Sequence, residues 1–399
     1  MDKKRTLIIL GAGASACFKS GNRKLPTQND ILKIFLYPKI SRSSPSVKLG
    51  GFMTDDGLSH SSFLADYLCR KFGIKKDNEN LLTEFWNKLS ERKLNLESLY
   101  DELEKDGTED GVKAKNDFIA ILLSKIRHGV GSRSRRDVCK YHLNLVKKLE
   151  ASDYIITFNW DTLIDDALLY GCPFWYPYTG YGVPVVGLGG KFFNKVHHIQ
   201  SLIELFHIHG SIGLYEPIEE RNKKGALVVG PRGFCLTHEM FDLMGMTEEI
   251  KSMQEKGRSG KPKPKRNITD DEQSLLDKGC IRIGEKNKIW YQPIFVTPNK
   301  YKPEYKSAYV SHIRKRIHSR LPYTENIIIA GYSFPPADFV HLKSIFVPEI
   351  IQRETSIMCI NFENEKDEFK EKARQIFPQN NINFDIKDFK EFCMDLNIE

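Results

Sequence analysis

The chain has 399 residues, of which 40% are hydrophobic and 11% aromatic, and it carries a formal net charge of +8 at pH 7. This composition excludes a disordered or fibrous chain, and the length predicts one large domain with insertions or two domains. The apolar runs have about the length of a strand, far short of the roughly 20 residues that a membrane-spanning helix needs, so we expect no membrane segment.

Eight cysteines are spread along the sequence without a CxxC pair. This spacing argues against a zinc ribbon and provides no disulfide framework, so we expect a cytoplasmic protein. Basic runs at residues 133–136, 256–266 and 314–320 are typical of solvated faces or loops. Contact of these runs with nucleic acid is the alternative that stays open.

The first predicted element is a strand at Thr6–Leu10, which leads directly into a glycine-rich turn. The turn, residues 11–16, reads GAGASA and matches the G-x-G-x-x-[GA] fingerprint in its expected position. Its glycines would permit a tight turn beside a pyrophosphate, although small residues that only pack a strand on a helix give the same letters. A hydride-transferring fold would add a second strand ending in an acidic residue. Here the sequence instead predicts a helix at Asp30–Phe35.

Between residues 41 and 140 the sequence predicts helices and no strand. Residues 81–106 and 115–127 have the spacing of amphipathic helices, so we interpret this part as an inserted helical module. Residues 247–288 are rich in Lys, Gly, Pro and Asp, which is typical of a loop or a peripheral insertion. The expected core comprises residues 1–40, 141–246 and 289–399.

The rest of the chain alternates strands with helices. The predicted strands are Tyr154–Phe158, Leu205–His209, Ile294–Thr297, Asn326–Gly331 and Ser356–Phe362. Several are apolar throughout, as strands covered on both faces must be. The predicted helices are Tyr141–Glu150, Thr162–Leu169 and Phe339–Val347. The alternation predicts an α/β fold with a Rossmann-like, doubly wound parallel sheet, a helical insertion and no zinc ribbon.

Polar residues follow two of these strands. Asn159 and Asp161 flank a tryptophan at the carboxyl end of one strand, where open α/β sheets bind ligands. His207 and His209 share one face of the next, and Gly210 lets the chain leave the sheet where a ligand could approach. A histidine in that place could act as a base.

Each of these polar residues also has a simpler explanation. Asn159 or Asp161 could only cap the helix that follows, and His209 could be a hydrogen-bonded core histidine. We expect His207 to be structural. A zinc site built from the histidines of this region is not expected, because no nearby cysteine or carboxylate completes a ligand set.

Short pieces of the chain match the sirtuin superfamily in the order of that family. The pieces are Gly11–Ser15, Gly21 with Pro26, Thr157–Asp161, His209 with Gly210, Gly331–Ser333 and Asn361–Glu363. The chain therefore resembles the divergent bacterial sirtuin-like branch of this superfamily. The resemblance covers residues 1–40 and roughly 140–399, and it leaves both insertions unexplained.

The resemblance implies catalytic roles for three residues. Asn159 would contact the nicotinamide ribose and help to position a water. Asp161 would engage the nicotinamide carboxamide, and His209 would be the general base. The resemblance also implies a set of residues that contact the rest of NAD, namely Gly11, Ala12, Gly13, Ser15, Thr157, Gly331, Ser333 and Asn361. Of these, the turn would hold the pyrophosphate and Asn361 the adenosine ribose.

Three features differ from the deacylating sirtuins. Pro26 is followed by Thr27-Gln28-Asn29 in place of Asp-Phe-Arg, Phe158 replaces a glutamine, and the four-cysteine zinc ribbon is missing. These differences put acyl-lysine binding in doubt and leave the NAD site largely intact. They are typical of the sirtuin-like NADases of bacterial antiphage systems.

The resemblance therefore implies an NAD+ hydrolase that releases nicotinamide and ADP-ribose and depletes NAD+ in antiphage defence. NAD would be the substrate, no metal is expected, and the protein would act as a homo-oligomer, with a HerA-type ATPase or an Argonaute as a partner. The sequence has no G-x-x-x-x-G-K-[ST] motif, so an ATPase would be a separate subunit. Two alternatives stay open: an NAD-dependent protein deacylase or ADP-ribosyl transferase, and a non-catalytic module that binds NAD or ADP-ribose.

Overall fold

A computed structural model of the chain describes residues 5–20, 23–25, 51–53, 59–61, 63–74, 84, 87–88, 90–92, 96–130, 138–177, 179–183, 185–187, 200–217, 234–236, 281–283, 289–295, 308–362 and 366–396. Several expectations fall outside these residues. They concern Gly21, Pro26, Glu363, the helix at Asp30–Phe35, the basic runs at 133–136 and 256–266, and most of the segment 247–288.

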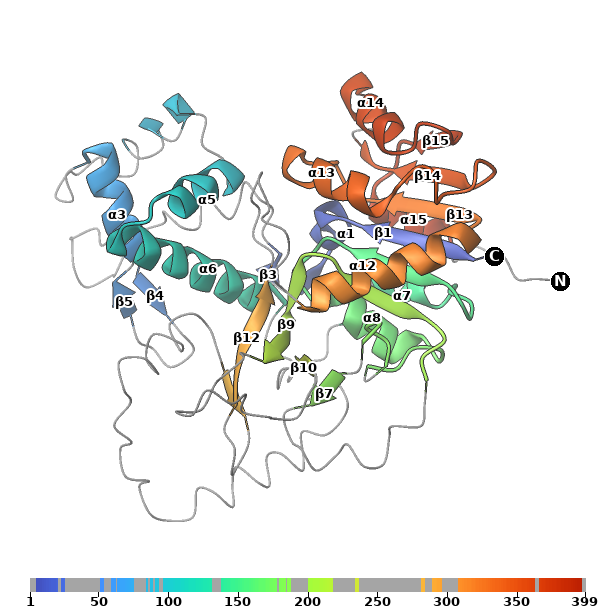
Figure 1. Cartoon of the computed structure of the whole chain (residues 1–399), viewed down its shortest axis with the longest axis horizontal. Helices are drawn as coiled ribbons and strands as arrows, with labels where there is room; N and C mark the ends of the chain where they lie inside the picture. Colours follow the sequence, from blue (N-terminus) through green and yellow to red (C-terminus); the bar gives the residue numbers. More distant parts are fainter. Residues whose placement is uncertain are drawn as a thin grey trace, which may run out of the picture.

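Six strands of apolar sequence pair in parallel to form the main sheet (Figure 1). They are β1 (Thr6–Leu10), β6 (Tyr154–Thr157), β8 (Glu204–His207), β13 (Asn326–Ala330), β14 (Ser356–Ile360) and β15 (Ile382–Asp385), in the order β15-β14-β13-β1-β6-β8. Every residue of β6 and β8 is buried, as expected for strands covered on both faces. The predicted doubly wound parallel sheet is confirmed, and its order is that of Rossmann folds.

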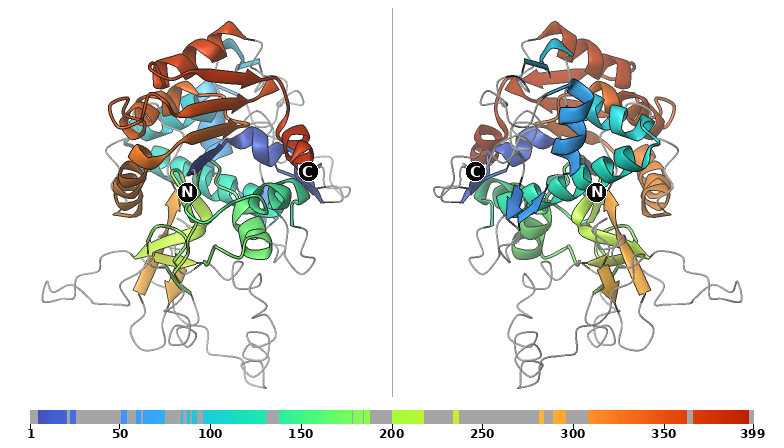
Figure 2. Two further views of the ribbon diagram at one scale, coloured as in Figure 1. Left: turned by 90° about the vertical axis from the view of Figure 1, so that its right-hand side faces the viewer. Right: turned by 90° about the vertical axis from the view of Figure 1, so that its left-hand side faces the viewer.

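Helices cover the two faces of this sheet (Figure 2). They are α1 (Ala12–Ala16), α7 (Lys140–Val146), α8 (Leu163–Gly171), α12 (Ala308–Arg320), the 3-10 turn η3 (Leu321–Tyr323), α13 (Pro336–Ile345), α14 (Asp367–Ile376) and α15 (Phe389–Asp395). On one face α7 contacts α8 and α15, and α15 also contacts α1. On the other face α12 contacts α13. The predicted helix at Tyr141–Glu150 ends earlier than expected, at Val146.

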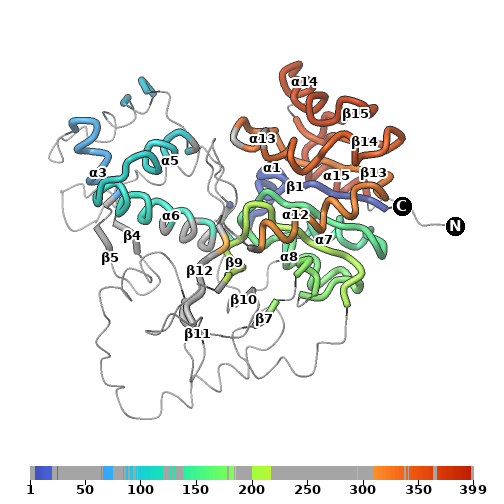
Figure 3. The backbone as a smooth tube through the Cα atoms, in the orientation of Figure 1, coloured from blue at the N-terminus to red at the C-terminus, as the bar shows by residue number. Residues whose placement is uncertain are grey.

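The strands are in register at their carboxyl ends. Leu10 of β1 pairs with Ala330 of β13 on one side and with Thr157 of β6 on the other, and Thr157 pairs with His207 of β8. Strand β1 lies between β6 and β13, and Figure 3 shows β1 and β13, which are far apart in the sequence, side by side. The residues that follow these four strands therefore meet at one edge of the sheet, where the strand order reverses.

A second, five-stranded sheet continues from the end of β8. Its strands are β11 (Ile281–Ile283), β12 (Ile289–Phe295), β9 (Gly210–Pro217), β10 (Phe234–Leu236) and β7 (Val185–Gly187), in the order β11-β12-β9-β10-β7. All of its pairs are antiparallel except β10 with β7. The strand predicted at Ile294–Thr297 overlaps the end of β12, which belongs to this second sheet, and residues 296–297 lie outside the described residues.

The part of the chain between residues 41 and 140 contains α5 (Leu96–Lys105) and α6 (Glu109–Val130), which overlap the two segments predicted to be helical, and α3 (Phe63–Phe72), which the sequence did not predict. Helix α6 contacts both α3 and α5 (Figure 1). Two short strands that the sequence did not predict, β4 (Gly51–Met53) and β5 (Ser59–Ser61), pair there as well. A second short antiparallel pair, β2 (Lys19–Ser20) and β3 (Arg23–Lys24), follows α1.

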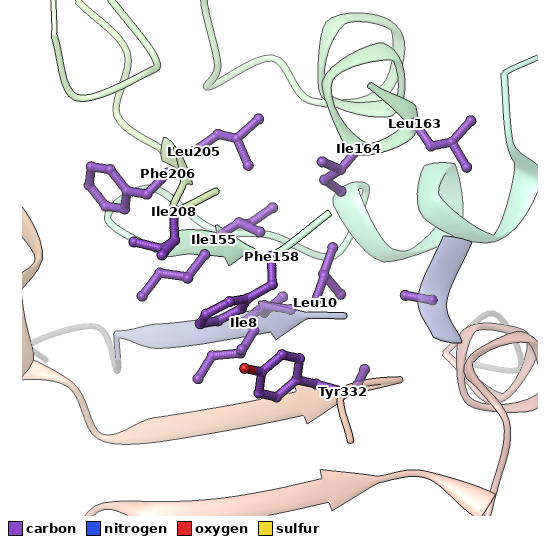
Figure 4. Close-up of a cluster of buried hydrophobic side chains, with 14 of the residues drawn as sticks. Ile8, Leu10, Ile155, Phe158, Leu163, Ile164, Leu205, Phe206, Ile208 and Tyr332 are labelled. Atoms are coloured by element: carbon purple, nitrogen blue, oxygen red, sulfur yellow. The ribbon is translucent and has the colours of Figure 1, made fainter. Parts of the chain in front are cut away.

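The buried core begins directly behind the carboxyl ends of the strands (Figure 4). Ile8 and Leu10 of β1 and Ile155 of β6 pack there with the rings of Phe158 and Tyr332. Those two rings stack with centroids 4.4 Å apart. None of the described helices has both the length and the apolar composition needed to cross a membrane.

Candidate functional site

Two glycine turns close against each other at the end of β1 and β13. The amide of Gly11 donates to the carbonyl oxygen of Ala330 at 3.1 Å, and the amide of Gly13 donates to that of Gly331 at 2.8 Å. Gly331 has a φ of +62°, and a Cβ placed on it would lie 2.2 Å from the backbone nitrogen of Ala14. Only glycine fits this crossing, because other residues would meet both strain and a backbone clash.

This contact uses some of the amides that the fingerprint would offer to an anion. Besides Gly13, Ala14 donates its amide within the protein, to the carbonyl oxygen of Gly11 at 2.9 Å. Ala12, Gly13 and Ser333 nevertheless lie on the surface, while Ser15 is buried. The surface of the turn is therefore open to a ligand, and its buried side is held by the protein.

Asn159 holds the glycine-rich turn from the neighbouring strand. Its side-chain nitrogen donates to the carbonyl oxygen of Gly11 at 2.9 Å and to the hydroxyl oxygen of Ser15 at 2.8 Å. Its own amide donates to the hydroxyl oxygen of Thr157 at 3.1 Å. The explanation that Asn159 only caps a helix is wrong, because the side chain points to the turn. Both amide hydrogens are engaged, so a ligand would meet the amide oxygen of Asn159.

Asp161 is buried beside the same serine. One carboxylate oxygen accepts the amide of Leu163 at 3.0 Å, at the first residue of α8, so the capping explanation describes part of its role. Burial raises the pKa of Asp161, and hydrogen bonds from Ser15 and from the Leu163 amide oppose that rise. Ser15 therefore joins Asn159 and Asp161 in one hydrogen-bonded group.

His209 is held between a carbonyl and a carboxylate. Its Nδ1 lies 3.2 Å from the carbonyl oxygen of Phe158, which can only accept, so Nδ1 carries a hydrogen. Its Nε2 lies 3.1 Å from a carboxylate oxygen of Asp338, and the Tyr332 hydroxyl donates to the other oxygen of that carboxylate at 2.8 Å. With Nδ1 protonated, Nε2 is the nitrogen that can take up a proton, and the Asp338 carboxylate is placed to accept a hydrogen bond from the N–H formed there.

Aromatic rings surround His209. The ring of Phe158 meets it edge-on at 5.2 Å, the ring of Trp160 lies at 6.3 Å, and the ring of His341 is stacked at 6.2 Å. Nδ1 of His341 in turn lies 3.2 Å from the guanidinium of Arg314 on α12. These neighbours exclude water from most of the imidazole, and the side chain of His209 is only 7% exposed.

His207 belongs to the core, as its expected structural role requires. Its Nε2 lies 3.1 Å from both carboxylate oxygens of Asp165, and the Tyr181 hydroxyl donates to the same carboxylate at 2.5 Å. Burial lowers the pKa of His207, and the charge and hydrogen bond of Asp165 raise it more, so the net direction is upward. His207 and His209, two residues apart, thus point to different carboxylates.

A pocket of about 250 Å³ opens on the other side of the glycine turns. Its walls are Gly13, Ala16, Cys17, Gly331, Ile360, Asn361, Phe362, Lys387, Asp388, Phe389 and Lys390. Its charged residues are Lys387, Lys390 and Asp388, and Lys387 is paired with Asp385 at 3.4 Å and with Asp395 at 2.9 Å. The side chain of Asn361 donates to the carbonyl oxygen of Tyr332 at 3.1 Å, which ties the pocket to the residues beside His209.

The structure thus brings the three residues expected to be catalytic to one edge of the sheet. Of the residues expected to bind the substrate, Gly11, Ser15 and Thr157 hydrogen-bond with Asn159, Gly13, Gly331 and Asn361 line the pocket, and Ala12 and Ser333 are exposed outside both groups. The sequence did not point to Asp338 or His341, and it pointed to Tyr332 only as part of the Gly331–Ser333 piece. Asp338 lies in the sequence PPAD, which signals the start of a helix, and no local pattern marks this carboxylate as the partner of a distant histidine.

No family model and no curated protein sequence matches this chain.

Proposed function

We propose that this protein hydrolyses NAD+ at the bond between nicotinamide and ribose. The observation that carries the proposal is the hydrogen-bonded group at the ends of β1 and β6. There Asn159 holds Gly11 and Ser15 at 2.9 and 2.8 Å, and Ser15 also bonds to Asp161. This group lies where the strand order reverses, which is where open α/β sheets bind nucleotides.

In this proposal the substrate spans the glycine turns. The pocket with Asn361 and Lys390 takes the adenosine and phosphate part, since Lys390 can attract a phosphate and about 250 Å³ is large enough for part of a dinucleotide. The nicotinamide end then lies beside Asn159 and Asp161. The resemblance to sirtuins supports the same orientation of NAD+, because it also places the adenosine ribose at Asn361 and the nicotinamide at Asn159 and Asp161.

The reaction needs positioning more than strong acid catalysis. The bond between C1′ and the pyridinium nitrogen breaks with its electron pair moving to nitrogen, so nicotinamide leaves as a neutral molecule. A water oxygen then bonds to C1′, and its proton passes to the His209–Asp338 pair and from there to solvent. Such base catalysis contributes typically 10²–10⁴-fold to a rate.

The carboxyl group of Asp161 suits the carboxamide of the leaving group. Its raised pKa favours the neutral form more than in an exposed aspartate, and either form can accept a hydrogen bond from the carboxamide nitrogen. The amide oxygen of Asn159 can accept a hydrogen bond from a ribose hydroxyl or from the water. Together they fix the scissile bond next to the base.

The test is incubation of the purified chain with NAD+, with nicotinamide and ADP-ribose separated by chromatography. We expect equal amounts of both products without any acylated peptide, and loss of turnover in Asn159→Ala and in His209→Ala. His312→Gln is the matched control, because His312 is exposed on α12. Turnover that requires an acyl-lysine peptide would support a deacylase instead. Tight NAD+ binding without products in every assembly state would support a binding module.

Destruction of a central cofactor has to be restrained until it is needed. We therefore propose that a cytoplasmic homo-oligomer, alone or with a separate ATPase or Argonaute-type subunit, controls the activity. Light scattering of the purified chain, alone and mixed with such a subunit, tests this part, and an active monomer that no partner affects would contradict it.

A further inference from the structure

A cluster of two cysteines and a histidine lies where three helices of one face meet. Cys17 follows the last residue of α1, Cys139 precedes the first residue of α7, and His142 lies in the first turn of α7. One ligand atom from each residue lies within 4.8 Å of the other two. Cys139 and His142 are buried, and Cys17 is partly exposed. This set is separate from Asn159, Asp161 and His209.

The distances fit a metal ion better than a disulfide. The two sulfur atoms are 3.9 Å apart, whereas a disulfide requires about 2.05 Å. Two thiolates on a tetrahedral zinc ion, with Zn–S bonds of about 2.3 Å, lie roughly 3.8 Å from each other. A histidine nitrogen bound to the same ion at about 2.0–2.1 Å would lie a little closer to each sulfur than the sulfurs lie to each other. Such distances fall within the 4.8 Å that separates the three ligand atoms at most.

The histidine gives a second, independent observation. His142 is 1% exposed, and its Nδ1 is buried without a hydrogen-bond partner among the described residues. The ring of Phe389 on α15 packs on the imidazole with centroids 4.9 Å apart, so the ring is fixed in place. Buried ring nitrogens ordinarily have a partner, and a bound metal ion is one such partner.

We propose that Cys17, Cys139 and His142 bind a zinc ion. Two thiolates and an imidazole are a donor set that zinc prefers, and three protein ligands leave a fourth position for water. The partly exposed Cys17 lines the pocket of about 250 Å³. Through this pocket the ion could enter from solvent, and the pocket has space for a water as the fourth ligand. The Cys17 thiol donates to the carbonyl oxygen of Ala14 at 3.0 Å, and zinc binding would displace that proton.

The ion would join the helix after the glycine-rich turn to α7. Its three ligands come from positions 17, 139 and 142, so binding closes a long loop of the chain. The sequence analysis expected no metal because it searched for CxxC pairs and histidine clusters. The spacing Cys139-x-x-His142, which brings both residues to one face of a helical turn, is the signal that was present. The zinc proposal stands independently of the proposed NAD+ hydrolysis.

Zinc content and affinity test this inference. The full chain is purified without metal-affinity steps, kept reduced, and measured by elemental analysis and by competition with a chromophoric zinc chelator. We expect a single tightly bound zinc per chain. Cys17→Ser, Cys139→Ser and His142→Gln should each weaken binding by at least about tenfold, since loss of even an outer-shell partner costs 10–100-fold.

Cys172→Ser is the matched control, because Cys172 is a buried thiol that does not belong to the cluster. It should retain zinc at wild-type affinity. Cys17 lies at a helix end and is partly exposed, so Cys17→Ser is the ligand variant expected to fold even if the two buried ones do not. Cobalt(II) added to the zinc-free chain should give the visible absorption of tetrahedral thiolate coordination, and Cys17→Ser should reduce it.

Three results would overturn the proposal. The first is a reduced wild-type chain that neither retains nor takes up zinc. The second is a folded Cys17→Ser variant that binds zinc as tightly as the wild type. The third is a Cys17–Cys139 disulfide in the zinc-free protein as purified, seen by mass spectrometry of peptides that were not reduced.

Discussion

The side chain of Asn159 uses both of its amide hydrogens within the protein, on Gly11 and Ser15. A residue in that position does two things at once, because it fixes the turn and leaves one oxygen for a ligand. His209 is placed in the same manner, with Phe158 on one nitrogen and Asp338 on the other. At the scale of residues, the candidate site is thus a set of polar groups that hold one another in fixed orientations.

The pair of His209 and Asp338 gives the first prediction. Removing the base in His209→Asn should lower the rate of NAD+ cleavage by about 10²–10⁴-fold. Asp338→Asn should lower it less, because the imidazole remains and only loses the carboxylate that orients it. Initial rates at saturating NAD+ measure both effects, with His312→Gln as the control that keeps the wild-type rate. An Asp338→Asn variant with full activity would show that the contact between these two residues has no role in turnover.

The buried pair of His207 and Asp165 gives a prediction about pH. The folded protein raises the pKa of His207, so the protonated histidine stabilises the fold. This contribution is present below the ordinary histidine pKa of about 6.5 and is lost as the pH rises through the raised pKa of the folded state. The free energy of unfolding of the wild type should therefore fall from neutral to mildly alkaline pH.

The His207→Gln variant should lack that part of the slope. Urea unfolding of the wild type and of the variant across this pH range gives the difference between their free energies of unfolding. The contributions of the other histidines cancel in this difference. Parallel curves for the two proteins would contradict the assignment of this charge to His207.

At the scale of elements, the two glycine turns act as one unit. The turn after β1 and the turn after β13 share hydrogen bonds from Gly11 and Gly13, and Gly331 needs a left-handed conformation to make them. The close contact between the two turns therefore depends on glycine residues, which have no side chain. This explains why the glycine-rich turn keeps its shape although α1 has only five residues.

Gly331→Ala tests this unit. Its left-handed conformation alone should cost about 1–2 kcal/mol, and the clash of the new Cβ with Ala14 adds to that cost. Gly107→Ala is the control, since nothing lies within 4 Å of its Cβ position, and surface changes of this kind stay within about 0.5 kcal/mol. Urea unfolding of the two variants measures their free energies of unfolding relative to the wild type. Equal stability of the two would mean that the turns separate easily.

Helix α12 carries the basic run at residues 314–320, and most of this charge is used inside the protein. Arg316 pairs with Glu204 of β8 at 2.9 Å, and Arg320 pairs with the same carboxylate. Arg314 contacts His341. These arginines therefore attach α12 to the sheet and to the surroundings of His209. A nucleic-acid contact by this run would have to compete with those pairs.

Glu204→Gln measures how much this attachment matters. Glu204 is buried and would leave two arginines without their carboxylate, so we expect a loss of about 2 kcal/mol, near the value for hydrogen bonds to charged groups. This loss of stability is smaller than the loss expected when a fully buried ion pair is broken, because the Arg316 side chain is 43% exposed. Glu368→Gln, which breaks an exposed pair with Lys372, should leave the unfolding midpoint unchanged. Equal midpoints for both variants would contradict a structural role of the run.

At the scale of the whole molecule, the strand order brings the glycine turns, the polar residues after β6 and the histidine after β8 to one edge. A ligand at this edge contacts segments from the first and the last parts of the described chain, from Gly13 to Lys390. It should therefore stabilise the fold as a whole and not one segment of it.

Thermal unfolding with ADP-ribose tests this coupling. At a concentration 100 times its dissociation constant, a ligand that binds only the folded state adds about 2.7 kcal/mol of stability. The unfolding midpoint should rise with ADP-ribose concentration in the wild type. The rise should be smaller in Asn361→Ala, whose side chain lines the pocket. Inosine without phosphates is the control ligand. A midpoint that ADP-ribose does not move would contradict binding at this edge.

The sequence by itself predicted five of the six strands of the main sheet, missing only β15, and it pointed to the polar residues at the carboxyl ends of these strands. Apolar runs of strand length, alternating with helices, are local patterns, and they correctly predicted a doubly wound parallel sheet. The same holds for the glycine-rich turn and for the polar residues that follow β6. The second sheet was missed, because strands such as β7 and β10 are only three residues long and are stabilised by pairing with distant segments.

Only the tertiary structure decided which side chains meet. Asp338 reaches His209, and Cys17 lies beside Cys139 and His142, across more than a hundred residues of chain in each case. Local sequence patterns do not reveal such contacts. A carboxylate at the start of a helix, or a single cysteine, has the same local sequence whether or not a distant residue contacts it. The strand register brings together the ends of β6, β8 and β13, near which His209 and Asp338 lie, whereas helix packing on one face of the sheet brings Cys17 to Cys139 and His142.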